Sequence, residues 1–287
     1  MVKIDKVSSS ISALGEGPLW DAKSQRLFWV DSLEGLLYCK DLKGGEQHWP
    51  LPAMLGSLAV ISDTSVLLAL QTGLHQFDLD SSQLSFLIDP EAAMPTTRLN
   101  DGKTDRAGNF VFGSMGVSER IKPLAALYRY TQAGEIQLLD DDVIVANGPC
   151  FSPAGDVLYF NDGRRRILAY DYSDKRALTH KRVLFEGADY NTGSDGATVD
   201  SEGNLWVALT GSAEIGCISR EGKLLDRIRM PINLPSSVMF GGPNLDELYV
   251  TSISNSGNRT STETNAGGLF RVTGLGVRGL AESRFGY

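Results

Sequence analysis

The sequence reads AGDVLYFND at residues 154–162, a tight turn followed by a short apolar strand, and this pattern occurs six times along the chain. Each copy has small or polar residues at the turn and β-branched, aromatic and aliphatic residues in the strand, which is typical of β-structure. The central residues of consecutive copies lie 39 to 48 residues apart. The copies are SQRLFWVD (24–31), DTSVLLAL (63–70), AGNFVFGSM (107–115), AGDVLYFND (154–162), EGNLWVALT (202–210) and LDELYVTSI (245–253).

A second pattern follows each copy of the first at a similar offset. It is a short run rich in aromatic and β-branched residues that leads into a polar turn. Its copies are GLLYCKD (35–41), GLHQFDLD (73–80), AALYRYT (125–131), RILAYDY (166–172), GCISREG (216–222) and GGLFRVT (267–273). A period of about 40 to 48 residues that holds about four strands is typical of a propeller blade.

The sequence therefore predicts an all-β fold, a six-bladed β-propeller formed by residues 1–287 as a single domain. We expect the N-terminal segment to add a strand to the last blade, because closing the ring removes exposed sheet edges. Helix signals are almost absent, with single turns expected only at 90–95 and near 118–124. The polar segment 254–266 is expected to be a loop.

The formal net charge of −8 argues against a polyanionic partner such as nucleic acid. The densest basic run is Arg164-Arg165-Arg166, which follows the turn Asn161-Asp162-Gly163. Two interpretations of this run remain open: a solvated loop, which is the commoner case, or a contact with an anionic substrate.

Cysteine usage and the N-terminal sequence point to a cytoplasmic protein. Cys39, Cys150 and Cys217 are far apart and form no CxxC pair, so neither a disulfide framework nor a zinc site is indicated. The N-terminus lacks the apolar core of a signal peptide, and no apolar run approaches the length of a membrane span. We expect no membrane partner and a monomer or a weak homo-oligomer.

Polar residues recur at one phase of the repeat, 11 or 12 residues before the central residue of the first pattern. They are Glu16 in LGEGPLWD, Asn100 with Asp101 in RLNDGK, Asn147 in ANGPCFSP and Asp195 in SDGATVD. Any one of the Asn-Gly or Asp-Gly pairs could be an ordinary turn. Since equivalent positions of different blades meet around the axis of a propeller, the four together predict a polar cluster there.

The cluster consists of carboxylate and amide oxygens, a ligand set that suits Ca²⁺ or Mg²⁺ and tolerates Mn²⁺, Fe²⁺ or Zn²⁺. Competing catalytic arrangements are weak. None of the three histidines, His48, His75 and His180, falls at this phase, and the sequence has no GxSxG elbow. A site for a divalent metal ion is therefore the favoured hypothesis.

Several of these segments together resemble the gluconolactonase/regucalcin family, also called the senescence marker protein family. The resemblance extends through all six predicted blades. The matching pieces are GEGPLWD (15–21), LFWVD (27–31), TRLNDGKTDRAGNFVFGSM (97–115), LYRY (127–130), NGPCFSPAGDVLYFND (147–162), DGATVDSEGNLWVAL (195–209) and PSSVMFGGPNLDELYVTS (235–252).

The resemblance implies a single divalent metal ion held by Glu16, Asn147 and Asp195. It also implies substrate contacts from Arg98 and Asn100. Arg98 has an alternative role as a structural partner of a nearby aspartate, either Asp101 or Asp105.

A further substrate contact is implied for Glu119, in the segment before the ALYRY strand. The insertion Lys122-Pro123 can move this acid, so a solvent-exposed loop glutamate is an equal alternative. Cys150, three residues after Asn147, is interpreted as a packing residue.

The activity implied by the resemblance is hydrolysis of a small sugar lactone to its aldonic acid. A metal ion can polarise the lactone carbonyl, Asp195 is the candidate general base, and Arg98 and Asn100 offer hydrogen bonds to hydroxyls or to the developing oxyanion. Two alternatives remain: a calcium-dependent esterase or phosphotriesterase on the same scaffold, and a non-catalytic calcium-binding propeller. Donors at Arg98 and Asn100 favour an enzyme, since a structural calcium site does not need them.

Overall fold

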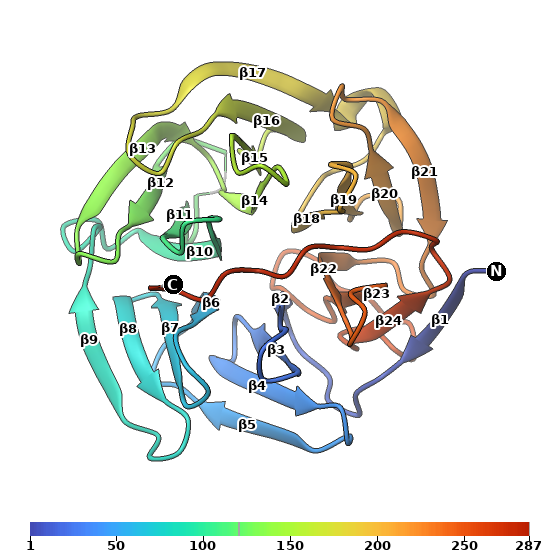
Figure 1. Ribbon diagram of the computed structural model, residues 1–287, viewed down its shortest axis with the longest axis horizontal. Helices are drawn as coiled ribbons and strands as arrows, with labels where there is room; N and C mark the ends of the chain where they lie inside the picture. Colours follow the sequence, from blue (N-terminus) through green and yellow to red (C-terminus); the bar gives the residue numbers. More distant parts are fainter. Residues whose placement is uncertain (120, 287) are drawn as a thin grey trace.

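The computed structural model describes residues 1–119 and 121–286, which form six four-stranded antiparallel sheets arranged in a ring (Figure 1). The prediction of a six-bladed β-propeller is confirmed. The first blade contains β2 (Gly15–Asp21), β3 (Arg26–Asp31), β4 (Leu36–Asp41) and β5 (Glu46–Pro50), and the second contains β6 (Leu55–Val60), β7 (Ser65–Leu70), β8 (Gly73–Asp78) and β9 (Leu84–Ile88). The third contains β10 (Thr97–Thr104), β11 (Phe110–Gly116), β12 (Ala125–Tyr130) and β13 (Ile136–Val143).

The remaining blades follow the same order from the axis outward. The fourth contains β14 (Asn147–Phe151), β15 (Val157–Asn161), β16 (Arg166–Asp171) and β17 (Thr179–Glu186), and the fifth contains β18 (Ala197–Val199), β19 (Leu205–Leu209), β20 (Glu214–Ile218) and β21 (Leu224–Arg229). The sixth contains β22 (Pro235–Gly241), β23 (Glu247–Ser252), β24 (Phe270–Thr273) and β1 (Lys3–Lys6). The first sequence pattern therefore forms the second strand of each blade, and the second pattern forms the third.

The ring is closed by its N-terminal strand, as expected. β1 pairs with β24 in antiparallel register from Lys3 opposite Thr273 to Lys6 opposite Phe270. The sixth blade is thus built from both ends of the chain.

Burial follows the position of a strand in its blade. β6, β7, β10, β11 and β12 are buried along their whole length, whereas the outermost strands β9 and β21 are mostly exposed. The inner strands are buried on both faces because each blade packs against a blade on either side, which explains their continuous apolar runs. The hydrophobic core therefore lies between the blades.

Helical structure is as scarce as the sequence predicts. Among the described residues the single helical element is the 3₁₀ turn η1 (Gly187–Tyr190). The segment expected to form a turn at 90–95 does so without a helix, with a hydrogen bond of 2.7 Å from Met94 N to Glu91 O. No helix in the described part of the chain has the length and hydropathy of a membrane span.

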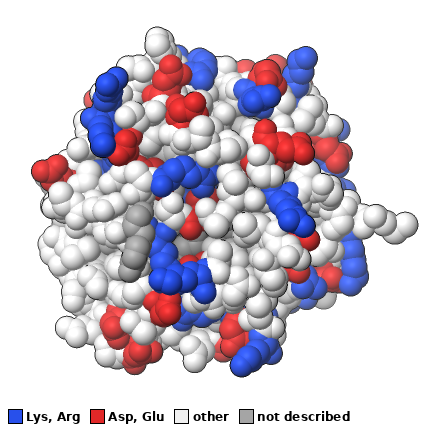
Figure 2. Space-filling view, in the orientation of Figure 1, with Lys and Arg blue, Asp and Glu red and all other residues white. Residues whose placement is uncertain are grey.

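The last residues, 274–286, cross one end of the ring, and we call them the C-terminal strap (Figure 1). The strap pairs with the fifth blade through a bridge between Asp200 and Gly279. It then reaches the second and third blades, where Phe285 N donates to Val60 O at 2.8 Å and Gly286 N to Gly108 O at 3.0 Å. These contacts lie at the ends of the inner strands, opposite the strand starts that carry the predicted site. Figure 2 shows the strap face, where acidic and basic side chains are interspersed.

Candidate active site

The predicted polar residues lie at the starts of the innermost strands. Glu16 is the second residue of β2, Asn100 the fourth of β10 and Asn147 the first of β14, while Asp195 lies two residues before β18. The register of the inner pair shifts directly after Glu16, Leu99 and Asn147. Such a bulge re-aims a side chain and is common beside functional sites. Three blades thus use the same local distortion near their site residue.

Two of the bulges depend on glycine. Gly17 has φ +51° and Gly148 has φ +57°, the left-handed region that side chains with a Cβ rarely adopt. Each glycine follows a predicted metal ligand and precedes a proline. The Gly-Pro pairs in GEGPLWD and NGPCF therefore specify this bend of the backbone.

A hollow of about 340 Å³ opens at this end of the channel, and its lining includes five of the six predicted site residues. They are Glu16, Arg98, Asn100, Asn147 and Asp195. The geometry therefore brings together residues that are up to about 180 positions apart in the sequence, as the repeat phase predicts.

Glu119 is the predicted site residue that does not line this hollow. Its carboxylate pairs with Lys122 Nζ at 3.2 Å and accepts a hydrogen bond from Ile121 N at 3.3 Å. These contacts are the ones expected of a loop glutamate beside the Lys122-Pro123 insertion. A substrate contact from Glu119 stays a prediction.

Two carboxylates dominate the electrostatics of the hollow, the half-buried Glu16 and the buried Asp195. Burial raises the pKa of Glu16 well above its usual value, and the negative charges of Asp195 and Asp101 add to this effect. Burial also raises the pKa of Asp195, to about 7, although the positive charge of Arg259 opposes the shift. Both shifts show that the site disfavours two uncompensated negative charges.

A divalent cation fits this donor set, because it would balance the two carboxylate charges and hard cations prefer oxygen ligands. In the described ranges, 1–119 and 121–286, no three His, Cys, Asp or Glu side chains gather as a metal-binding group. A metal ion bound by Glu16 and Asp195 would therefore need an amide oxygen as well, and Asn147 supplies one in the same hollow.

The amide of Asn100 is oriented by the fourth blade. Its Nδ2 donates to Ala146 O at 2.9 Å and to Asn147 Oδ1 at 2.7 Å. Both N–H groups are thereby used, and one of them fixes the oxygen of a predicted ligand. The atom of Asn100 that remains for a substrate is Oδ1, which accepts a hydrogen bond from a hydroxyl rather than donating to an oxyanion.

Asp101 lies one layer below the hollow instead of lining it. Its carboxylate accepts hydrogen bonds from Gly148 N at 2.7 Å and Gly102 N at 2.8 Å. The adjacent Lys103 donates from Nζ to Ala197 O at 2.8 Å. Burial raises the pKa of Asp101, and the charge of Lys103 opposes that shift. This layer ties the third, fourth and fifth blades together beneath the site.

Arg98 is predicted to contact the substrate, and this role stays a prediction. It lines the hollow, is almost fully buried, and donates from Nη1 to Leu99 O at 2.9 Å. Burial raises the pKa of Glu16, and the positive charge of Arg98 opposes that rise. Asp105, one of its alternative partners, accepts instead from the Tyr172 hydroxyl at 2.6 Å and from Asn109 Nδ2 at 2.9 Å.

The hollow also contains two residues that the repeat phase did not indicate, Asn161 and Arg259. It contains Arg165 as well, from the basic run for which contact with an anionic substrate was one of the two open interpretations. Asn161 ends β15, opposite Asn147, and its position at the end of the pattern LYFND is the signal that could have identified it. Arg165 and Arg259 lie in loops, where the repeat does not fix the direction of a side chain. Cys150 is buried in the core, as expected of a packing residue.

The raised pKa of Asp195 gives metal binding a pH dependence. Because carboxylates bind a cation in their charged form, binding must displace a proton held by Asp195 or Glu16. We expect each bound metal ion to release about one proton at a pH of about 6.5 and less than one above about pH 8. The apparent affinity for the metal ion should rise between these two pH values. Calorimetric titration with Mn²⁺ in two buffers of different ionisation enthalpy measures the release. Constant affinity without proton release would contradict a site built on these two acids.

The chain matches the family model described as SMP-30/Gluconolactonase/LRE-like region over residues 14–254. It is 33% identical to L-arabinolactonase of Azospirillum brasilense, over 96% of this chain and 92% of that protein. It is 31% identical to 6-deoxy-6-sulfogluconolactonase of Pseudomonas putida, over 96% of this chain and 95% of that protein. A crystal structure of regucalcin from Agrobacterium tumefaciens, described as a calcium-binding protein, aligns with a TM-score of 0.90 at 27% identity, covering 98% of this chain and 97% of that one.

Proposed function

This chain belongs to the SMP-30/gluconolactonase/LRE-like family, and from that membership we propose that it is a metal-dependent lactonase that hydrolyses a sugar lactone to its aldonic acid. The observation that carries the proposal is the hollow at the channel mouth. There, two carboxylates and an amide suited to a cation lie beside a buried arginine and a second, oriented amide. The names of relatives in the family, such as L-arabinolactonase, support this reaction class.

The residues that would hold the ion are Glu16, Asn147 and Asp195. A divalent ion would supply Lewis-acid polarisation of the lactone carbonyl. Re-addition of single metals to the EDTA-treated protein identifies the ion among Ca²⁺, Zn²⁺, Mn²⁺, Mg²⁺ and Fe²⁺.

The remaining steps belong to side chains of this protein. Asp195 accepts the proton of the attacking water and returns it to the ring oxygen as the acyl C–O bond breaks, which opens the ring to the acid. Arg98 donates to the carbonyl oxygen as negative charge develops there. Asn100 Oδ1 accepts a hydrogen bond from a hydroxyl of the substrate and so orients the ring.

Metal-dependent turnover of sugar lactones tests this proposal. We expect the purified protein to open glucono-, galactono-, xylono- or arabinono-lactone, to lose this activity with EDTA, and to regain it with Mn²⁺, Zn²⁺ or Ca²⁺. A pH indicator in weak buffer reports the acid that forms. Background rates on every lactone with every metal would contradict the lactonase assignment. If Ca²⁺ still bound in that case, the protein would be a non-catalytic calcium-binding propeller.

A further inference from the structure

A second hollow, of about 620 Å³, adjoins the candidate active site. The two hollows share Arg165, Gly193 and Arg259 in their linings. Arg229 lines only the second hollow, which we call the outer hollow. The outer hollow extends over the fifth blade, beside the residues that follow β19 and end β21. A ligand whose reactive group lies beside Asp195 can therefore extend past two arginines towards a third.

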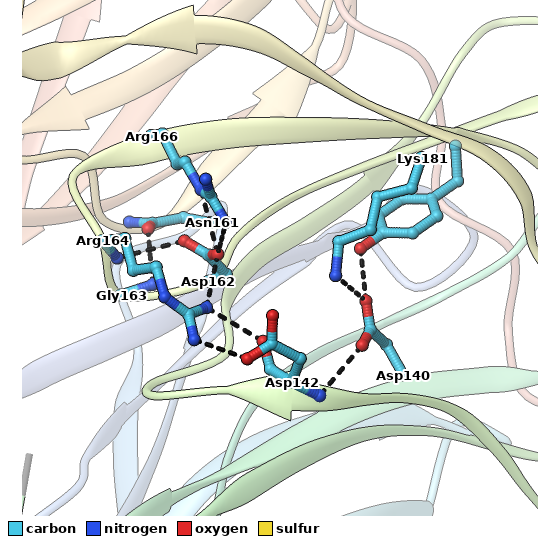
Figure 3. Close-up of polar contacts among 9 residues, drawn as sticks. Asp140, Asp142, Asn161, Asp162, Gly163, Arg164, Arg166 and Lys181 are labelled. Carbon is cyan, nitrogen blue, oxygen red and sulfur yellow. Dashed lines mark hydrogen bonds and ion pairs between the residues drawn. The ribbon is translucent and has the colours of Figure 1, made fainter. Parts of the chain in front are cut away.

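The three arginines of the run 164–166 differ in their contacts. Arg164 binds Asp162 Oδ2 at 2.7 Å and Arg166 binds the same oxygen at 2.8 Å, while the side chain of Asp162 is fully buried (Figure 3). Arg164 also pairs with Asp142 at 2.6 Å. These two arginines therefore stabilise the turn between β15 and β16, and their charges are balanced by Asp162 and Asp142.

Arg165, between them, faces the two hollows instead. Its Nε donates to Thr192 O at 3.0 Å, which anchors the guanidinium and leaves its two Nη groups for a ligand. Its φ of +61° is in the left-handed region, where a non-glycine residue is uncommon and often marks a functional site. The turn thus holds an arginine at a position where glycine or asparagine would fit the backbone more easily.

Arg229 and Arg259 line the outer hollow together with Arg165. Within the described part of the chain, none of the three forms an ion pair with Asp or Glu. Arg229 is anchored by a hydrogen bond of 2.6 Å from Nη1 to Ser212 O, and Arg259 acts electrostatically on Asp195. In a chain of net charge −8, three guanidinium groups at one rim form a local positive potential.

We propose that Arg165, Arg229 and Arg259 form an anion subsite, so that the substrate is a sugar lactone with a phosphate or sulfonate at the end remote from its carbonyl. This inference rests on the proposed lactonase function. A planar guanidinium group can donate paired hydrogen bonds to a phosphate or a sulfonate. Hydrogen bonds to main-chain carbonyl oxygens already fix the side chains of Arg165 and Arg229 in place. A neutral aldonolactone would leave these groups unused.

The test compares neutral and anionic ligands on the metal-loaded protein. Its variants are Arg165→Gln, Arg259→Gln and the double variant, with Arg278→Gln as control. Arg278 is an exposed strap residue on the opposite face and lines neither hollow. One readout is kcat/KM for gluconolactone and for its terminally phosphorylated and terminally sulfonated forms. The other is calorimetric binding of the corresponding open-chain acids, which requires no turnover.

We expect the native protein to favour one anionic ligand over the neutral one by about tenfold or more, and this preference to weaken with ionic strength. Each single variant should lower the preference about tenfold and the double variant further, while the control keeps it. The phosphorylated and sulfonated ligands show which anion the subsite accepts.

Equal binding and turnover of neutral and anionic ligands by the native protein would overturn the subsite while leaving the lactonase function intact. A preference that the double variant retains would also overturn it. If no lactone is hydrolysed but an anionic acid binds and the double variant loses that binding, the proposed reaction fails and the subsite stands.

Discussion

Asp195→Asn is expected to abolish turnover and to weaken metal binding at the same time. The substitution keeps the size of a side chain that is 9% exposed but removes its charge, and with it a predicted metal ligand and the proton acceptor. We expect kcat/KM to fall by at least about 10³-fold, because several kcal/mol of catalysis by the ion and the base are lost together. Mn²⁺ affinity, measured by calorimetry, should fall by about 100-fold or more.

The melting temperature of the Asp195→Asn variant distinguishes this loss of function from unfolding of the protein. Burial raises the pKa of Asp195 to about 7, so its stabilising contribution to the metal-free protein is present at low pH and lost as pH rises through 7. At about pH 8, the metal-free Asn variant should therefore melt at or above the temperature of the metal-free native protein. Asp80→Asn, an exposed turn residue of the second blade, is the matched control and should change neither property. A variant that keeps full turnover would refute both roles.

Arg284→Ala is expected to destabilise the protein by about 3 kcal/mol, because it leaves a buried carboxylate without its cation. Arg284 binds Asp21 through Nε at 3.0 Å and Nη2 at 2.6 Å, and Nη2 also reaches Asp63 at 2.6 Å. The side chain of Asp21 is 3% exposed. Urea denaturation measures the loss, and Arg278→Ala, an exposed residue of the same strap, should stay within about 0.5 kcal/mol of the native protein.

This loss should depend on pH. Burial raises the pKa of Asp21, but hydrogen bonds from Arg284 and Ser24 outweigh it and hold the pKa below its usual value. A lowered acid pKa adds stability above the unfolded value of about 3.9, and that stability disappears as pH falls through the folded value. The difference between the native protein and Arg284→Ala should therefore shrink below about pH 4. A pH-independent difference would show that the ion pair is not its source.

The repeat allowed the fold and the inner ring of the site to be predicted because strand spacing fixes both. Glu16, Asn100, Asn147 and Asp195 share one phase, and a shared phase places them at one end of the channel whatever the loops do. The strand register that directs these side chains towards the axis is harder to predict from the sequence. The Gly-Pro pairs after Glu16 and Asn147 nevertheless indicate where the bulges lie. The sequence therefore contained most of the geometry of the hollow.

The loops and the strap could not be predicted in this way. Arg165 and Arg259 lie in turns of different length, and only the contacts of their neighbours decide where they point. In the run 164–166, the buried Asp162 forms ion pairs with Arg164 and Arg166, whereas Arg165 has no such pair among the described residues and lines the hollows. No sequence pattern shows this difference. The strap has no counterpart in the repeat, so neither Arg284 nor its bond to Asp21 could be anticipated.

The pairing of β1 with β24 has a consequence for how the protein is made. β1 leaves the ribosome before β24 and must wait until residues 270–273 have been synthesised before its partner exists. Until then the nascent chain carries an unpaired strand at one end and an incomplete blade at the other. Either can pair with another copy of the chain, so exchange of β1 between molecules competes with correct folding at high expression levels.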